Sequence, residues 1–431
     1  MSAMNELARC AALGVALGFF AAAARAQAPA AAPEVLSLRH AVSEAVLRHP
    51  VRLRAGHEAA AAGFQRDAAE WGRFPTLTVD AAPRVAGGDT PSGTPTTTVR
   101  LEQPLWAGGR IDASIDAARS QLSAAESAET ETRQRLAERA SLAFVGWMHA
   151  LERVEIARAG AAQLAELVRY VRRRESEGVA SPADVAIATA RHGNVLSLAT
   201  ALRGALERAR AELEAVTLIS SFRSGVPVSV PAYPERGDAQ VEKEYLDNSP
   251  LIAQRRAEAE AARGQAAVRR GQMLPRVALR LEHLSGQSAA LGAGNESRAS
   301  VVLQFTPEAG LASYSGYQAA GSRVEAAAAQ LDADDNELRL RARTHWADYA
   351  ATRAQVGEIE PQVTALDAAA RSFMRQFEAG RKSWLEVLNT HRELVDARIS
   401  LSQARTARDQ AALRLMVNAG AFWPWLETLP R

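Results

Sequence analysis

Near its C-terminal end the chain reads Phe377-Glu-Ala-Gly-Arg-Lys-Ser-Trp-Leu-Glu-Val-Leu-Asn389, a segment that joins two helical patterns through a single glycine. A related segment, Glu177-Gly-Val-Ala-Ser-Pro-Ala-Asp-Val185, occurs far upstream. Gly178 and Gly380 are 202 positions apart, and Ala107-Gly108 and Ala309-Gly310 have the same offset. Several landmarks at one constant offset indicate that a long structural unit occurs twice.

Each unit contains a long coiled-coil helix. From Arg110 to about Glu175 the sequence has no proline, and apolar residues follow alternating steps of four and three from Leu136 to Val171. This period of 3.5 is typical of a coiled-coil seam rather than of an ordinary surface helix. At 1.5 Å per residue, such a helix would extend over roughly 95 Å. The second unit repeats the rhythm up to Phe377, with Pro361 expected to bend the helix locally.

Each unit also contains a predicted hairpin. Polar and apolar residues alternate in pairs of segments, which is typical of strands with two different faces. The four strands are predicted at about 74–82, 96–105, 275–284 and 298–306. One face is aliphatic, the other carries charged and polar residues, and aromatic residues gather at the inner strand ends. This composition favours a transmembrane β-barrel, although a soluble hairpin with one buried face fits the alternation alone.

These patterns divide the chain into five regions. They are a signal peptide at 1–26, a first repeat at 36–218, a connector at 219–238, a second repeat at 239–420 and a C-terminal tail at 421–431. The tip turns lie at 176–185 and 377–389. The first region has an apolar run that ends in Ala24-Arg25-Ala26, which predicts secretory cleavage after Ala26 or, as a second choice, after Ala28. Cys10 lies within it, so no cysteine remains after cleavage.

Composition excludes several classes of function. The net charge is only +2, so no basic field favours nucleic acid. Neither a phosphate-binding loop nor a CxxC motif occurs, and His40, His49 and His57 have a spacing that does not form a metal site. We therefore expect no enzyme, catalytic residue, metal or cofactor. The remaining alternative to a membrane β-barrel protein is a soluble periplasmic coiled-coil adaptor or structural rod.

The whole pattern resembles the outer membrane factor (TolC) family of export channels, from about residue 36 to 420. The most specific matches are Gln103-Pro-Leu-Trp-Ala-Gly-Gly-Arg110, the Gly178 turn with Asp184, and the segment from Gly380 to Asn389. The resemblance implies a mainly α fold with a small β part: a homotrimeric 12-stranded outer-membrane β-barrel continued by a 12-helix coiled-coil tunnel through the periplasm. The segment 377–398 is most similar to the branch that serves type I protein secretion.

The resemblance also implies a function and partners. The protein would be the outer membrane channel-tunnel of a tripartite export system, and would pass secreted proteins or small molecules to the outside. Its partners would be two further copies of itself, outer membrane lipid, a periplasmic adaptor and an ABC or proton-driven inner-membrane pump. Gly178 and Gly380 would form the tip turns at which the adaptor docks.

The same resemblance implies a gate at the periplasmic tip. Lys382 matches a basic residue that pairs with an acid of the first turn, here Asp184. Glu386 matches an acid at the narrowest point of the pore, where a ring of carboxylates would favour cations. A second acid of the family pattern is replaced by Asn389, so this ring should carry half the charge. Phe377 replaces a tyrosine that hydrogen-bonds across the tip in some members, and its heptad spacing favours a core position.

Overall fold

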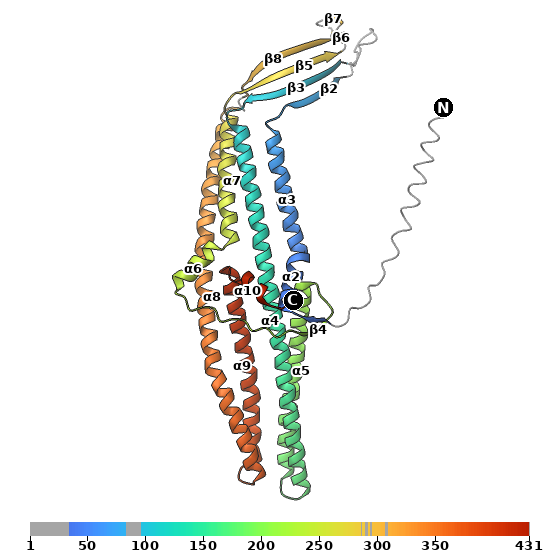
Figure 1. Cartoon of the computed structure of the whole chain (residues 1–431), viewed down its shortest axis with the longest axis vertical. Helices are drawn as coiled ribbons and strands as arrows, with labels where there is room; N and C mark the ends of the chain where they lie inside the picture. The colour runs from blue at the N-terminus through green and yellow to red at the C-terminus, as the bar shows by residue number, and fades with distance from the viewer. Residues whose placement is uncertain are drawn as a thin grey trace, which may run out of the picture.

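The computed structural model describes residues 34–82, 96–285, 287–288, 292–293, 295–306 and 309–430. The predicted signal peptide, Cys10 and the first hairpin loop lie outside these residues. Long helices run side by side along the molecule, and a sheet covers one end of them (Figure 1). Among the described helices, none combines the length and the hydrophobicity needed to cross a membrane.

The two repeats follow one plan. The first consists of β1 (Glu34–Leu36), α2 (Leu38–Arg48), α3 (Pro50–Trp71), β2 (Thr76–Ala82), β3 (Thr96–Trp106), α4 (Arg110–Ser176) and α5 (Pro182–Thr217). After β4 (Phe222–Gly225), the second consists of α6 (Asp238–Asp247), α7 (Pro250–Gln272), β5 (Arg276–Ser285), β6 (Gln287–Ser288), β7 (Gly292–Ala293), β8 (Glu296–Gln304), α8 (Ala312–Glu378) and α9 (Trp384–Asn418). The chain ends in α10 (Phe422–Thr428). The mainly α fold with two helix–hairpin–helix repeats is confirmed.

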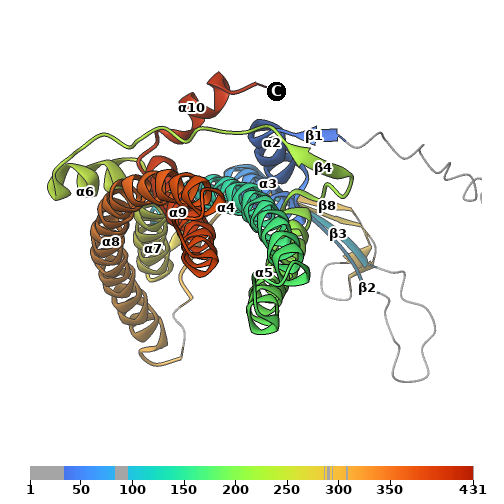
Figure 2. The ribbon, with the colours of Figure 1, turned by 90° about the horizontal axis from the view of Figure 1, so that it is seen from below.

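The long helices α4 and α8 have 67 residues each and begin and end 202 positions apart. Every predicted seam position of α4 from Leu136 to Val171 is buried, which confirms the 3.5-residue period. α8 continues through Pro361 without ending. Seen along the long axis, α8, α9, α4 and α5 form a curved layer, and α2, α6, α10, β1 and β4 lie on its convex side (Figure 2).

The hairpins of the two repeats combine into one antiparallel sheet in the order β2-β3-β5-β8. In this register Leu77, Leu101 and Leu281 share one face and are exposed. The opposite face carries ion pairs between strands, Arg100 with Glu282 at 2.7 Å and Arg280 with Glu102 at 2.9 Å. The sheet is therefore apolar on one side and charged on the other, as the alternation predicts.

Three local features differ from the sequence-based expectation. The prediction of a single helix from about Ala239 to Gln272 is wrong, because the helix is interrupted at Asn248 and a new helix begins at Pro250. The Ser249 hydroxyl caps this new helix by accepting from the Ile252 N–H at 3.3 Å. The connector contains β4, which pairs in parallel with β1. The tail contains α10. Strands and helices of three to seven residues are too short to produce a readable periodicity.

Helices from different repeats approach closely where one of them has glycine. A Cβ atom placed on Gly160 of α4 would lie 2.5 Å from Val395 Cγ2 of α9. Real contacts are never that short, so the glycine is required for this approach of α4 to α9.

We expect Gly160→Ala to lower the free energy of unfolding by about 1–3 kcal/mol, because overpacking outweighs the better helix propensity of alanine. Thermal unfolding of the detergent-purified protein measures this. Gly193→Ala in α5 is the matched control, since a Cβ there would contact nothing within 4 Å. It should stabilise the helix slightly; an equal loss for both variants would contradict the packing explanation.

Candidate functional site

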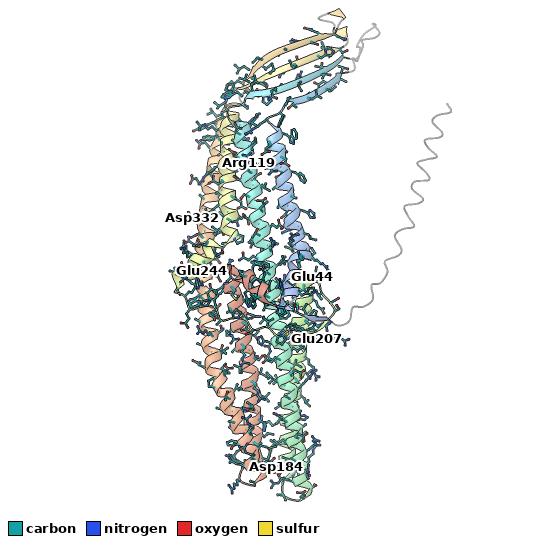
Figure 3. The ribbon with its side chains drawn as sticks, viewed as in Figure 1. Glu44, Arg119, Asp184, Glu207, Glu244 and Asp332 are labelled. Atoms are coloured by element: carbon teal, nitrogen blue, oxygen red, sulfur yellow. The ribbon has the colours of Figure 1, made fainter. Side chains whose placement is uncertain are left out.

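The two helix turns lie together at the end of the molecule opposite the sheet, where Asp184 is labelled (Figure 3). In both turns a glycine adopts a left-handed backbone, with φ of 74° at Gly178 and 73° at Gly380. The glycine N–H and the next N–H donate back to the last helical turn, which is the Schellman arrangement. These bonds run from Gly178 to Glu175, Val179 to Arg174, Gly380 to Phe377 and Arg381 to Gln376, at 2.8–2.9 Å. Glycine is thus needed at both positions for its φ angle.

Both predicted gate acids cap the helix that follows the turn. Asp184 accepts from the Ser181 backbone N–H at 2.9 Å, and Glu386 accepts from the Ser383 backbone N–H at 3.2 Å. Each serine hydroxyl accepts from the backbone N–H of the acid in return, so each turn has a complete capping box. Asp184 and Glu386 are also equivalent positions of the two repeats. The signal for this role was present in the sequence as Ser-x-x-Asp and Ser-x-x-Glu.

The predicted partners Lys382 and Asp184 do not pair within the described part of one chain. Lys382 Nζ instead contacts Glu386 Oε1 at 2.5 Å and lies 4.4 Å from the centre of the Phe373 ring. The hydrogen bond from Lys382, followed by those from Ser383, lowers the pKa of the Glu386 carboxyl. The backbone and hydroxyl of Ser181 lower the pKa of Asp184, and the Trp384 side chain lowers it further. A Lys382–Asp184 link between protomers stays a prediction.

Phe377 joins the two helix pairs above the turns. It is only 3% exposed, its ring lies 5.0 Å from that of Tyr170 at an angle of 60°, and the Arg174 guanidinium lies 5.9 Å from its centre. We name the surrounding group the tip cluster. It consists of Ala161, Leu164, Leu167, Tyr170, Val195, Phe373, Met374, Phe377, Trp384, Val387 and Leu388. The sequence placed Phe377 in a core but did not reveal Tyr170 as its neighbour.

Asn389 occupies the helix turn after Glu386. It lies in α9 and is half-buried, between the buried residues Leu388 and Thr390. The five predicted gate residues thus come from α5, α8, α9 and the second turn, all at one end of the molecule. The arrangement offers hydrogen bonds, ion pairs and apolar contacts that could hold this end in one conformation.

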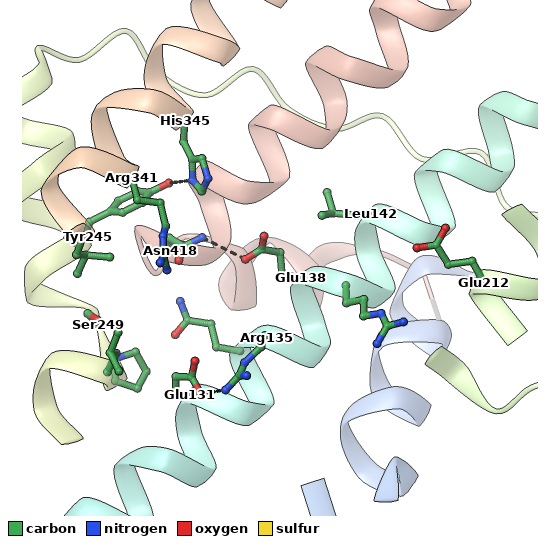
Figure 4. Close-up of a pocket in the computed structure, with 15 residues that line it drawn as sticks. Glu131, Arg135, Glu138, Leu142, Glu212, Tyr245, Ser249, Arg341, His345 and Asn418 are labelled. Carbon is green, nitrogen blue, oxygen red and sulfur yellow. Dashed lines mark hydrogen bonds and ion pairs between the residues drawn. The ribbon is translucent and has the colours of Figure 1, made fainter. Parts of the chain in front are cut away.

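A second feature with many polar side chains is a pocket of about 440 Å³ halfway along the rods (Figure 4). It lies where α9 ends and α7 begins. Glu138 accepts from Asn418 Nδ2 at 3.2 Å, and the Tyr245 hydroxyl lies 3.0 Å from His345 Nδ1. Burial raises the pKa of Glu138 and lowers the pKa of His345 to about 4. The three lining glutamates, Glu131, Glu138 and Glu212, are matched in number by Arg135, Arg139 and Arg341. Among the described residues, no three His, Cys, Asp or Glu side chains are arranged to hold a metal ion.

Comparison with known proteins identifies relatives of this chain. The sequence profile described as "Outer membrane efflux protein" matches residues 41–217 and 242–421. The "Cobalt-zinc-cadmium resistance protein CzcC" of Cupriavidus metallidurans is 28% identical over 322 residues, which cover 72% of this chain and 74% of CzcC. The "Outer membrane efflux protein BepC" of Brucella suis is 22% identical over 330 residues, 74% of this chain and 72% of BepC.

The solved structure of the outer-membrane channel OprN has the same fold, with a TM-score of 0.75 at 19% identity, covering 90% of each chain. The expected resemblance to the TolC family is therefore confirmed. These matches do not specify the type I secretion branch, which stays a prediction.

We expect Phe377→Ala to loosen the tip, because loss of a buried aromatic side chain costs about 3–5 kcal/mol of local packing. Trypsin is a direct probe, since Arg172, Arg173, Arg174, Arg381 and Lys382 lie near the turns. Cleavage there should accelerate severalfold.

The matched control is Val356→Ala, which removes a buried residue higher on the same helix, in a cluster with Leu401 and Ala404. It should leave cleavage at the turns unchanged. Equal acceleration in both variants would mean that trypsin reports global stability rather than the tip cluster.

Proposed function

The chain belongs to the outer membrane efflux protein family, and on that premise we propose that three copies of it form the exit duct of a tripartite export system. The protein is an outer-membrane efflux channel that extends into the periplasm. Members of the family form trimeric channels that work with adaptors and inner-membrane pumps. The alternative of a soluble adaptor or rod is thereby set aside, and transport energy would come from the pump.

The sheet supports a barrel shared by several chains. β2 and β8 are its outer strands, so within the described residues of one chain each has an unpaired edge. Unpaired edges are unfavourable, particularly in lipid, where every backbone polar group needs a partner. An even number of antiparallel strands per chain lets β8 of one copy pair antiparallel with β2 of the next. Three copies then close a barrel of 12 strands with the aliphatic face outward.

The cavity enclosed by such a barrel would be polar. The charged face of the sheet carries alternating Arg and Glu that neutralise one another across the strands. The exposed aromatic side chains Trp71, Phe74, Trp106 and Phe305 lie at the ends of the strands nearest the helices, where an interfacial belt is expected.

We assign the gate to the turns at the far end of the helices. The support is that Asp184, Lys382, Glu386, Asn389 and Phe377 all lie there. Because Lys382 engages Glu386 within its own chain, a link to Asp184 of a neighbouring copy would have to share or replace that pair. Exposed pairs contribute about 0–1 kcal/mol each, so an adaptor docked at the Gly178 and Gly380 turns would need to offset only a small sum.

We further propose small solutes as the cargo rather than secreted proteins. The supporting observation is that the matching family and both relatives are described by efflux or by metal resistance. A deletion strain that keeps its tolerance of toxic solutes but loses export of a protein would assign the opposite cargo.

The detergent-purified protein is expected to be a trimer that resists SDS and shifts in mobility on heating, because barrel strands shared between copies separate only when the sheet melts. Cross-linking and gel electrophoresis with and without boiling measure this. A stable monomer or dimer would refute the shared barrel.

Lys382→Ala or Asp184→Ala should raise the conductance of the purified trimer in a planar bilayer, since each removes one member of the proposed link between protomers. Asp335→Ala, which removes a partly exposed ion pair with Arg339 far from the turns, is the control. Unchanged conductance in both tip variants would remove the ionic lock and leave the tip cluster as the closing contact.

A further inference from the structure

A histidine between two carboxylates connects the repeats in the middle of the molecule. His149 lies on α4, and its Nδ1 is 2.9 Å from Oε2 of Glu152 on the same helix. Its Nε2 is 3.1 Å from Oδ2 of Asp409 on α9, which is 260 positions away in sequence. A carboxylate only accepts hydrogen bonds, and a neutral imidazole has only one N–H. Both contacts are satisfied together only when the ring is an imidazolium.

The two carboxylates are held in place by further bonds, one across the helix pair and one within α9. Glu152 Oε2 also accepts from the Ser402 hydroxyl at 2.8 Å, and the other oxygen of Asp409 accepts from Arg408 at 2.6 Å. Arg153 on α4 donates to the Thr406 hydroxyl of α9 at 3.0 Å. Ser402 is 1% and Asp409 5% exposed, so the α9 side of the network is buried, whereas the Glu152 side chain is 40% exposed. Loss of the imidazolium charge therefore removes one charged partner from the buried Asp409 carboxylate.

The carboxylates of Glu152 on α4 and Asp409 on α9 favour the protonated form of His149. The nearby guanidinium groups of Arg153 on α4 and of Arg405 and Arg408 on α9 oppose it, because like charges repel. Burial alone lowers the pKa of His149, but the hydrogen bonds to Asp409 and Glu152 outweigh it and raise the pKa above its ordinary value of 6.5. The bond from His149 is the main cause that lowers the pKa of Glu152.

We propose that His149 is a proton-operated clasp between α4 and α9, closed when both ring nitrogens carry hydrogen and weakened when one proton leaves. After proton loss one nitrogen presents a lone pair to a carboxylate, and the contact becomes repulsive. The clasp joins α4 of the first repeat to α9, the helix that follows the second tip turn. Under the proposed function, on which this consequence rests, alkaline conditions loosen the α8–α9 pair from α4 and favour opening.

The sign of the effect follows from the raised pKa. Stabilisation by the clasp is fully present below the unfolded-state pKa of 6.5 and is lost as pH rises through the folded-state pKa. The protein should therefore lose stability above about pH 6.5 in a way that depends on His149.

The test is the thermal unfolding midpoint of the full detergent-purified chain at a series of pH values from about 5.5 to 9. The wild-type midpoint should fall across this range by about 3 °C more than that of His149→Gln, which keeps a hydrogen-bonding amide but cannot take up a proton. Asp409→Asn removes the partner charge and should reduce the pH dependence of the unfolding midpoint in the same way. This second variant provides the test if His149→Gln fails to fold.

His345→Gln is the matched control. His345 is another partly buried histidine of the rods, hydrogen-bonded to Tyr245, and its pKa of about 4 keeps it neutral over this range. This variant should lower the midpoint equally at every pH. Profiles of wild type, His149→Gln and Asp409→Asn that stay parallel would overturn the clasp. This readout needs no channel activity, so failure of the clasp is distinguishable from failure of the proposed duct, which the trimer assay reports.

Discussion

The unbroken apolar seam of α4 is the constraint on which the other elements depend. It repeats every 3.5 residues, and small side chains occupy much of it, so neighbouring helices approach closely. A Cβ atom on Gly264 of α7 would lie only 2.8 Å from the Cβ of Ala117 on α4. A Cβ atom on Gly160 of α4 would lie only 2.5 Å from Val395 of α9. Alanine occupies many seam positions and buries little apolar area per residue, so the stability of the seam depends on its length and on close packing as well as on larger residues such as Leu136 and Trp147. We therefore expect increases in side-chain volume at these close contacts to destabilise the rod.

The duplicated turn shows how one structural solution can acquire two roles. Both copies have the left-handed glycine, the Schellman bonds and the capping box, all formed by residues close in sequence. Each turn is therefore a locally stable unit that would keep its shape if the helix pair moved. The differences lie elsewhere: Ala180 and Pro182 of the first turn correspond to Lys382 and Trp384 of the second. The second turn thus has the additional charge and the additional aromatic ring of the tip cluster.

The parts of the fold that were predictable from sequence are those with a long period. Heptads, alternating strands and a repeat offset are visible because many residues carry the same signal. The short parallel pair β1–β4 and helix α10 were missed because they form through tertiary packing of a few residues. The break before Pro250 was readable from Ser249-Pro250 but was hidden within an otherwise continuous helical pattern.

The candidate gate was predictable as a place but not as a set of contacts. Sequence position put Asp184, Lys382 and Glu386 near the turns, whereas the partner of each depends on local geometry. An acid three residues after a serine at a helix start accepts hydrogen bonds from backbone N–H groups, and a lysine just before the helix reaches the glutamate four residues later in its first turn. Both local solutions cost less conformational entropy than a contact between distant chains. The contacts that do connect the repeats, Phe377 with Tyr170 and His149 with Asp409, have no sequence periodicity of their own. A long coiled coil brings such pairs together, because its regular seam fixes which residues face one another over hundreds of positions of sequence.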